Sequence, residues 1–169
     1  MKFPVKCFVV GFASLFLASC TNNEKKATAE FNRQYIKVSE DLNRRYNEAQ
    51  RDYCSANIYV AEQGVKDFQI WLLDTNNPTE PVIDRDSALY LINGRLFLIE
   101  EHIGNTNQAE KFYQESVEDW SNHLKYIQSL NRPPEPQPLQ PISSKEELRD
   151  RFVHMEGILD VGWRKQSQP

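Results

Sequence analysis

Residues 31–53, FNRQYIKVSEDLNRRYNEAQRDY, have apolar side chains that recur at steps of three and four residues. This spacing places them on one face of an α-helix, with charged and amide side chains on the remaining surface. The pattern therefore predicts a long amphipathic helix whose apolar stripe faces a core. A coiled-coil partner surface is the alternative interpretation, but the run is short and aromatic for a coiled coil. The stripe consists of Phe31, Tyr35, Val38, Leu42, Tyr46, Ala49 and Tyr53.

A second helix is predicted over residues 58–74. We expect a break before it at residues 55–57, because an unbroken helix from 27 to 74 would be about 70 Å long, which is excessive for so small a domain. Turn-forming residues from Asp74 to Pro81 end this helix. Its apolar positions are Val60, Ala61, Gly64, Val65, Phe68, Trp71 and Leu72.

Two more helices are predicted in the second half of the chain. Asn107, with a glutamate three residues later, is expected to cap a helix that runs to residue 130. Ser144 begins the capping box Ser-Lys-Glu-Glu at the start of a final helix, which either folds back on the bundle or binds a partner. The apolar stripes are Tyr113, Val117, Trp120, Leu124, Ile127 and Leu130 in the first, and Leu148, Phe152, Met155 and Leu159 in the second.

Residues 88–99 fit two structures. Asn93-Gly94 between two apolar runs is typical of a two-residue β-hairpin. The same residues also have a helical spacing of apolar side chains, with Asp84 or Asp86 available as an N-cap and Gly104 as a C-cap. A lone hairpin beside four helices would be marginally stable, so a helix is favoured.

The first twenty residues have the features of an export signal. Lys2 and Lys6 precede an apolar stretch over residues 7–16, which is shorter than the ~20 residues of a membrane-spanning helix. Leu17-Ala18-Ser19-Cys20 follows, and this box resembles the lipobox of bacterial lipoproteins. The resemblance covers residues 1–20 alone.

The lipobox resemblance implies how the chain is processed and where it resides. Leu17, Ala18 and Ser19 would be recognised by the signal peptidase, and Cys20 would carry diacylglycerol and an N-linked acyl chain such as palmitate. Thr21 follows the cysteine in place of an aspartate, which favours the periplasmic face of the outer membrane in a Gram-negative cell. Two or more acyl chains hold a protein firmly on its membrane.

The expected architecture is all-α: a compact bundle of four or five amphipathic helices with a Pro-rich strap before the last helix. Proline removes backbone donors, so the strap cannot be helical and should be an extended polyproline II segment. The expected organisation is a signal peptide (1–19), a flexible tether (20–26), a helical domain (27–131), a Pro-rich linker (132–142), a C-terminal helix (143–161) and a flexible tail (162–169).

No catalytic or metal-binding motif stands out from chance. His102, His123 and His154 fall on three different predicted helices, and a pairing of Asp119 with His123 along one helix is expected rather than a metal site. Cys54 is the one cysteine outside residues 1–20, so an intramolecular disulfide is excluded and the thiol is interpreted as a small core residue. We expect no enzyme activity and no cofactor beyond the covalent lipid, with an unrecognised hydrolase as the remaining enzymatic alternative.

Charge and composition narrow the classes of partner. Lys2 and Lys6 are the only charged residues in the first 19, so their removal changes the formal net charge from −4 to −6. An acidic domain of this kind argues against nucleic-acid binding, which requires clustered cations. The sequence favours a membrane-anchored envelope lipoprotein that binds another envelope protein as an accessory or assembly factor. The alternative is a periplasmic inhibitor or immunity protein against a toxin or lytic enzyme.

Overall fold

A computed structural model describes residues 22–74, 84–130, 140–157 and 159–165. These residues form six helices and no strand, which confirms the expected all-α bundle. The helices are α1 (Asn22–Tyr53), α2 (Ile58–Leu73), α3 (Arg85–Ile103), α4 (Thr106–Ser129), α5 (Lys145–Met155) and α6 (Gly162–Lys165).

The chain divides into two units, residues 1–34 and 35–169, and α1 runs across the boundary. In the first unit the described residues are the initial turns of α1. Because this helix begins at Asn22, the part of the expected flexible tether that the structure describes is helical. Polar residues such as Glu and Lys have good helix propensity, so the lack of an apolar period there did not prevent a helix.

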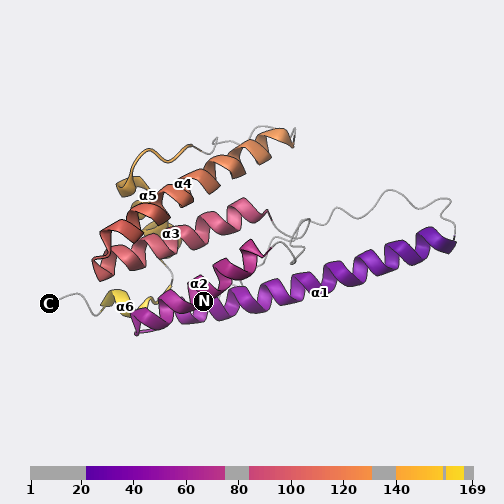
Figure 1. Cartoon of the computed structure of the whole chain (residues 1–169), viewed down its shortest axis with the longest axis horizontal. Helices are drawn as coiled ribbons and strands as arrows, with labels where there is room; N and C mark the ends of the chain where they lie inside the picture. The colour runs from indigo at the N-terminus through magenta and orange to yellow at the C-terminus, as the bar shows by residue number, and fades with distance from the viewer. Residues whose placement is uncertain (1–21, 75–83, 131–139, 158, 166–169) are drawn as a thin grey trace, which may run out of the picture. The chain divides into compact units, whose positions relative to one another are not determined.

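Helix α3 is the centre of the second unit. Figure 1 shows it between α2 and α4, and it also packs against α5. From Ala88 to Glu100 every residue except Leu91 is buried. A helix that is enclosed on all sides can be apolar all round, which explains why its sequence lacks a clear polar face.

The hairpin alternative for residues 88–99 is excluded, because the whole stretch lies inside α3. Asp84 is the N-cap, and its side chain accepts a hydrogen bond from the backbone N–H of Asp86. Gly104 ends the helix with φ of 85°, a left-handed conformation that glycine adopts without a Cβ penalty. Asn93 and Gly94 therefore belong to a helix. The capping residues Asp84 and Gly104 were the local signal that distinguished this helix from a hairpin.

Glycine at position 94 allows α5 to approach α3 closely. A Cβ atom added there would lie 2.1 Å from Cζ of Phe152, whose ring is fully buried. The last long helix therefore folds back on the bundle, as one of the two alternatives for it predicted. The Ser144 hydroxyl accepts from the Glu147 N–H as expected, while the Glu147 carboxylate accepts from the backbone and hydroxyl of Ser143.

The buried polar side chains of α3 are Asn93, Arg95 and Glu100. The Asn93 amide joins two neighbouring helices: its oxygen accepts from Gln69 of α2 at 2.5 Å, and its nitrogen donates to Asp119 of α4 at 2.7 Å. This bridge fixes α2 and α4 in register on opposite sides of the central helix.

Glu100 and Arg95 make ionic contacts with other parts of the bundle. Glu100 accepts from Lys66 of α2 at 3.1 Å and from the Asn105 side chain at 3.0 Å. Arg95 donates to Glu156, just after α5, at 2.9 Å, and both side chains are about 5% exposed. Such a pair is costly to desolvate, and removal of either partner leaves a buried charge.

The sharp bend between α1 and α2 is closed by the C-terminal turn. The break expected at residues 55–57 is present, with Asn57 as the N-cap of α2. Carbonyl groups at a helix end lack intrahelical donors. Here Cys54 O accepts from Gly162 N at 3.1 Å, Ser55 O from Trp163 N at 3.0 Å, and Tyr53 O from the Trp163 indole at 2.9 Å.

The flexible tail expected for residues 162–169 is therefore wrong for residues 162–165. These form α6, and Trp163 is 2% exposed. Gly162 is required at this contact, because an added Cβ would lie 2.9 Å from the backbone of Ala56. The final helix also ends earlier than expected, at Met155, and a turn separates it from α6.

The side chain of Tyr53 completes this C-terminal contact. Its hydroxyl donates to Glu156 at 2.9 Å and accepts from Arg164 at 2.7 Å. Burial and the neighbouring Glu156 carboxylate raise the pKa of Tyr53, so the phenol stays neutral and available as a donor. One network therefore joins four side chains from distant parts of the chain: Tyr53, Arg95, Glu156 and Arg164.

Helix α4 begins two residues earlier than expected, because Asn105 and not Asn107 is its N-cap and Thr106 is its first residue. The Asn105 side chain makes no capping bond and contacts Glu100 instead. The predicted stripe is confirmed in part, because Trp120 is buried and Tyr113, Val117 and Leu124 are partly buried against the core, but the other three fully buried residues were not in that stripe. The buried residues are Ala109, Phe112, Ser116 and Trp120.

Most of the Pro-rich strap, residues 132–139, lies outside the described residues. Its final part is held by the bundle: the Gln140 carbonyl accepts from the Trp120 indole at 2.8 Å and from Arg151 at 2.9 Å. Ile142 is buried, so this end of the strap contributes to the core.

Gly94→Ala should destabilise the fold by about 1–3 kcal/mol, because the new methyl group would overlap the Phe152 ring in a closely packed core. Urea denaturation measures the loss. The matched control is Gly157→Ala, where the nearest heavy atom would be 3.4 Å away and the change should stay within about 0.5 kcal/mol. Equal effects of the two substitutions would contradict the close approach of α3 and α5.

Asp119→Asn should reduce the pH dependence of stability. Burial, together with Asp86, Glu115 and Glu118, raises the pKa of Asp119 to about 6, although the hydrogen bond from Asn93 opposes the shift. Between pH 4 and 6 the folded state keeps a proton that the unfolded state releases, so stability falls as pH rises through this window.

After allowance for partial exposure, removal of this carboxylate should add about 1 kcal/mol at pH 7.5. The free energies of unfolding at pH 5 and pH 7.5 test this, with the exposed Asp150→Asn as control. A variant that is less stable at pH 7.5 and has an unchanged pH profile would refute the assignment.

Candidate partner-binding surface

The outer face of α2 is unusually apolar. Eleven large apolar side chains are exposed in the described part of the chain, and four of them lie on this helix of 16 residues. Its inner face already packs in the core through Ala61, Val65, Phe68 and Leu72. The outer residues therefore do not belong to the stripe that drives folding. They are Tyr59 (68% exposed), Val60 (43%), Ile70 (65%) and Leu73 (53%).

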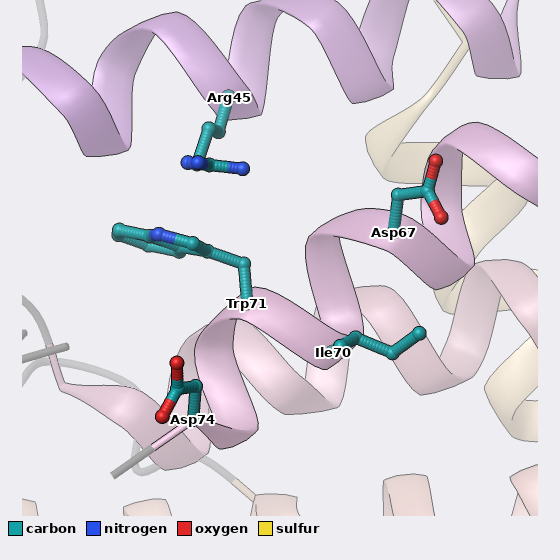
Figure 2. A pocket seen from close by; sticks show the side chains of 5 residues that line it. All are labelled: Arg45, Asp67, Ile70, Trp71 and Asp74. Carbon is teal, nitrogen blue, oxygen red and sulfur yellow. The ribbon is translucent and has the colours of Figure 1, made fainter. Parts of the chain in front are cut away.

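A cavity of about 390 Å³ lies beside this face, where α1 passes α2. Figure 2 shows Arg45 reaching from α1 toward the ring of Trp71, which projects from α2. The guanidinium carbon lies 5.1 Å from the ring centroid, a cation–π arrangement. Trp71 is also stacked on Phe68, with centroids 6.0 Å apart, so its ring is held from within the core. The cavity is lined by Arg45, Asp67, Ile70, Trp71 and Asp74.

The charges around the cavity come from both helices. Arg45 donates to the Asp41 carboxylate on its own helix at 3.1 Å, so its charge is offset locally. Asp67 and Asp74 are exposed, and Asp67 accepts a hydrogen bond from Gln63 at 2.6 Å. We define the α2 surface as this cavity together with Tyr59, Val60, Ile70 and Leu73.

A second cavity, of about 260 Å³, lies between α3, α5 and α6. It has an apolar part made of Leu98, Val153 and Trp163. Its cations already have partners: Arg149 makes two hydrogen bonds to Glu101, at 2.7 and 2.8 Å, and Arg164 pairs with Glu156. These pairs connect the helices, so this cavity is interpreted as part of the fold.

The histidines do not come together. His123 pairs with Asp84 at the start of α3, and Asp119 bonds to Asn93, so the predicted Asp119–His123 pair is wrong. The ring of His102 contacts Trp163 edge to face, with centroids 5.0 Å apart. Among the described residues, no three metal-ligating side chains of the His, Cys, Asp or Glu type are clustered.

Cys54 is a free cysteine that is partly buried beside the core. Burial raises the pKa of its thiol, with a further contribution from Glu156 and Asp160. A thiol with a raised pKa has less of the reactive thiolate form. This environment agrees with the interpretation of Cys54 as a packing residue.

The site residues that the sequence predicted, Leu17, Ala18, Ser19 and Cys20, lie outside the described residues. Within the described part, no helix has the length and apolarity needed to cross a membrane. The α2 surface itself was not predicted, because Val60 was assigned to the inner stripe and Ile70 and Leu73 were left unassigned. The runs Ile58-Tyr59-Val60 and Ile70-Trp71-Leu72-Leu73 contain more adjacent apolar residues than one helix face can bury, which is the signal that could have found it.

Comparison with known proteins identifies no relative of this chain. No model of a protein family matches it, and neither the curated proteins nor the solved structures searched contain a match.

Proposed function

We propose that this chain is a lipid-anchored envelope protein with a non-catalytic, protein-binding role, as an accessory or assembly factor of an envelope complex. Cys20 would carry the lipid, and the helical bundle would bind its partner through the α2 surface at the periplasmic face of the outer membrane.

The observation that carries this proposal is the exposed apolar face of α2. Large apolar side chains that gather on one exposed helix face are typical of protein–protein interaction sites. Here one of the four, Ile70, lines a cavity that also contains an aromatic ring and a guanidinium group, two groups that are enriched at interface hot spots.

The proposed location rests on the lipobox resemblance of residues 17–20. Residues 21–41 separate Cys20 from Leu42, the first buried residue of α1, and they are helical from Asn22 onward. An acyl anchor would confine the protein to the membrane surface, so a partner in the same envelope would be met at high effective concentration.

Photo-crosslinking in intact cells tests the binding role. A photoreactive amino acid replaces Ile70 on the α2 surface, and Gln128, an exposed residue of α4, is the matched control position. We expect a discrete adduct of higher mass from position 70 and none from position 128. Recovery of the monomer alone from positions 59, 70 and 73 would overturn the proposal.

Cys20→Ala tests the anchor separately. The variant should lose incorporation of labelled palmitate and should no longer fractionate with membranes, because no other residue supplies the thiol for lipid attachment at the lipobox. Retained palmitate, or a native protein that begins with Met1, would contradict the proposed processing.

A further inference from the structure

We propose that the α2 surface binds an amphipathic helix that carries two basic side chains, Lys or Arg, spaced two turns apart beside an apolar ridge. This inference rests on the proposed binding function and names the chemistry of the partner. It follows from the apolar residues, the cavity and the arrangement of charge on one exposed helix face.

The apolar part of the surface fits a helix. Ile70 and Leu73 are exposed one turn apart on α2, and the cavity beside Trp71 is open between α2 and α1. An amphipathic helix binds in such a groove through side chains at steps of three and four residues. One of these side chains would enter the cavity against Trp71, while others would cover Ile70 and Leu73.

The charge that α2 contributes to this surface is acidic, and Arg45, the cation that lines the cavity, comes from α1. Asp67 and Asp74 are exposed, whereas Lys66, the one Lys or Arg on α2, is half-buried and pairs with Glu62 and Glu100. Complementary charge at the edge of an apolar contact selects partners and speeds their association. Basic side chains are therefore expected where the partner passes Asp67 and Asp74.

The spacing of these two carboxylates sets the spacing of the cations. Asp67 lies on α2 and Asp74 is the C-cap that follows it seven residues later, so the two positions are separated by about 10.5 Å along the helix axis. Residues seven apart on a partner helix that lies along α2 have the same separation. Arg45 does not oppose this pairing strongly, because it donates to Asp41 and lies against Trp71.

A second copy of this chain fits the surface poorly. A symmetric dimer through α2 would bring Asp67 and Asp74 of both copies into one interface, and like charges there are unfavourable. An anionic lipid surface is disfavoured for the same reason, since it attracts clustered cations.

The test is to sequence the segment that crosslinks to position 70 in the full-length protein in cells. We expect an amphipathic helical segment with Lys or Arg at two positions seven residues apart. Three results would overturn the inference: a crosslinked segment without these cations, a peptide from a second copy of this chain, or a lipid adduct. Each of them would show that the α2 surface binds a molecule of a different kind. The absence of any adduct would overturn the proposed function as well.

Charge reversal makes the same test quantitative. Asp67→Lys combined with Asp74→Lys should lower the crosslinking yield by about tenfold or more. The matched control is Glu40→Lys with Glu118→Lys, which makes the same change in net charge at exposed positions of α1 and α4 and should leave the yield unchanged.

A charge swap separates recognition from a general loss of folding. Replacing the two partner cations by Glu should restore the yield of the Asp67→Lys, Asp74→Lys variant, because opposite charges again face each other. Failure of the swap to restore any yield in a variant with normal helical content would overturn the inference, as would an equal loss in the control pair.

Discussion

The structure depends on the enclosure of α3 from Ala88 to Glu100. A helix buried on all sides must find a partner for every polar group it carries, because an unpaired buried polar group is costly. Asn93 and Glu100 meet this requirement with groups from α2, from α4 and from the α3–α4 turn. Arg95 meets it in part, because its Nε donates to Glu156 after α5 while its buried Nη1 has no hydrogen-bond partner among the described residues. Together these contacts connect α2, α4, the α3–α4 turn and the segment after α5 to the central helix.

This arrangement also explains why a surface remains available on α2. The inner face of α2 contacts α3, and the bend that precedes it is closed by Gly162 and Trp163. Helix α2 therefore cannot rotate to bury Ile70 and Leu73 without breaking these contacts. If the outer face of α2 binds a partner as proposed, a helix held this firmly would lower the entropic cost of binding.

The fold class was predictable from the sequence, and the candidate site was not. The helical spacing in residues 31–53 predicted a helix correctly, but the expected core face is wrong at its start, because Phe31 is 55% exposed and the buried members of the stripe are Leu42, Ala49 and Tyr53. The residues that cap α3 at its two ends also led to a correct prediction. The closing of the α1–α2 bend by Trp163 joins residues about 110 apart, and no periodicity encodes such a contact. The α2 surface was missed because a stripe analysis assigns apolar residues to the core, whereas here one helix has apolar residues on two faces.

A double-mutant cycle on Arg95 and Glu156 tests the central claim most directly. Glu156→Gln should cost about 3 kcal/mol, because it leaves the buried Arg95 charge without its carboxylate. Adding Arg95→Met to that variant should recover at least about 1 kcal/mol of the loss, which would show that the two side chains are coupled. Small, additive effects of the two substitutions in urea denaturation would contradict the account, since α3 would then not depend on its buried polar partners.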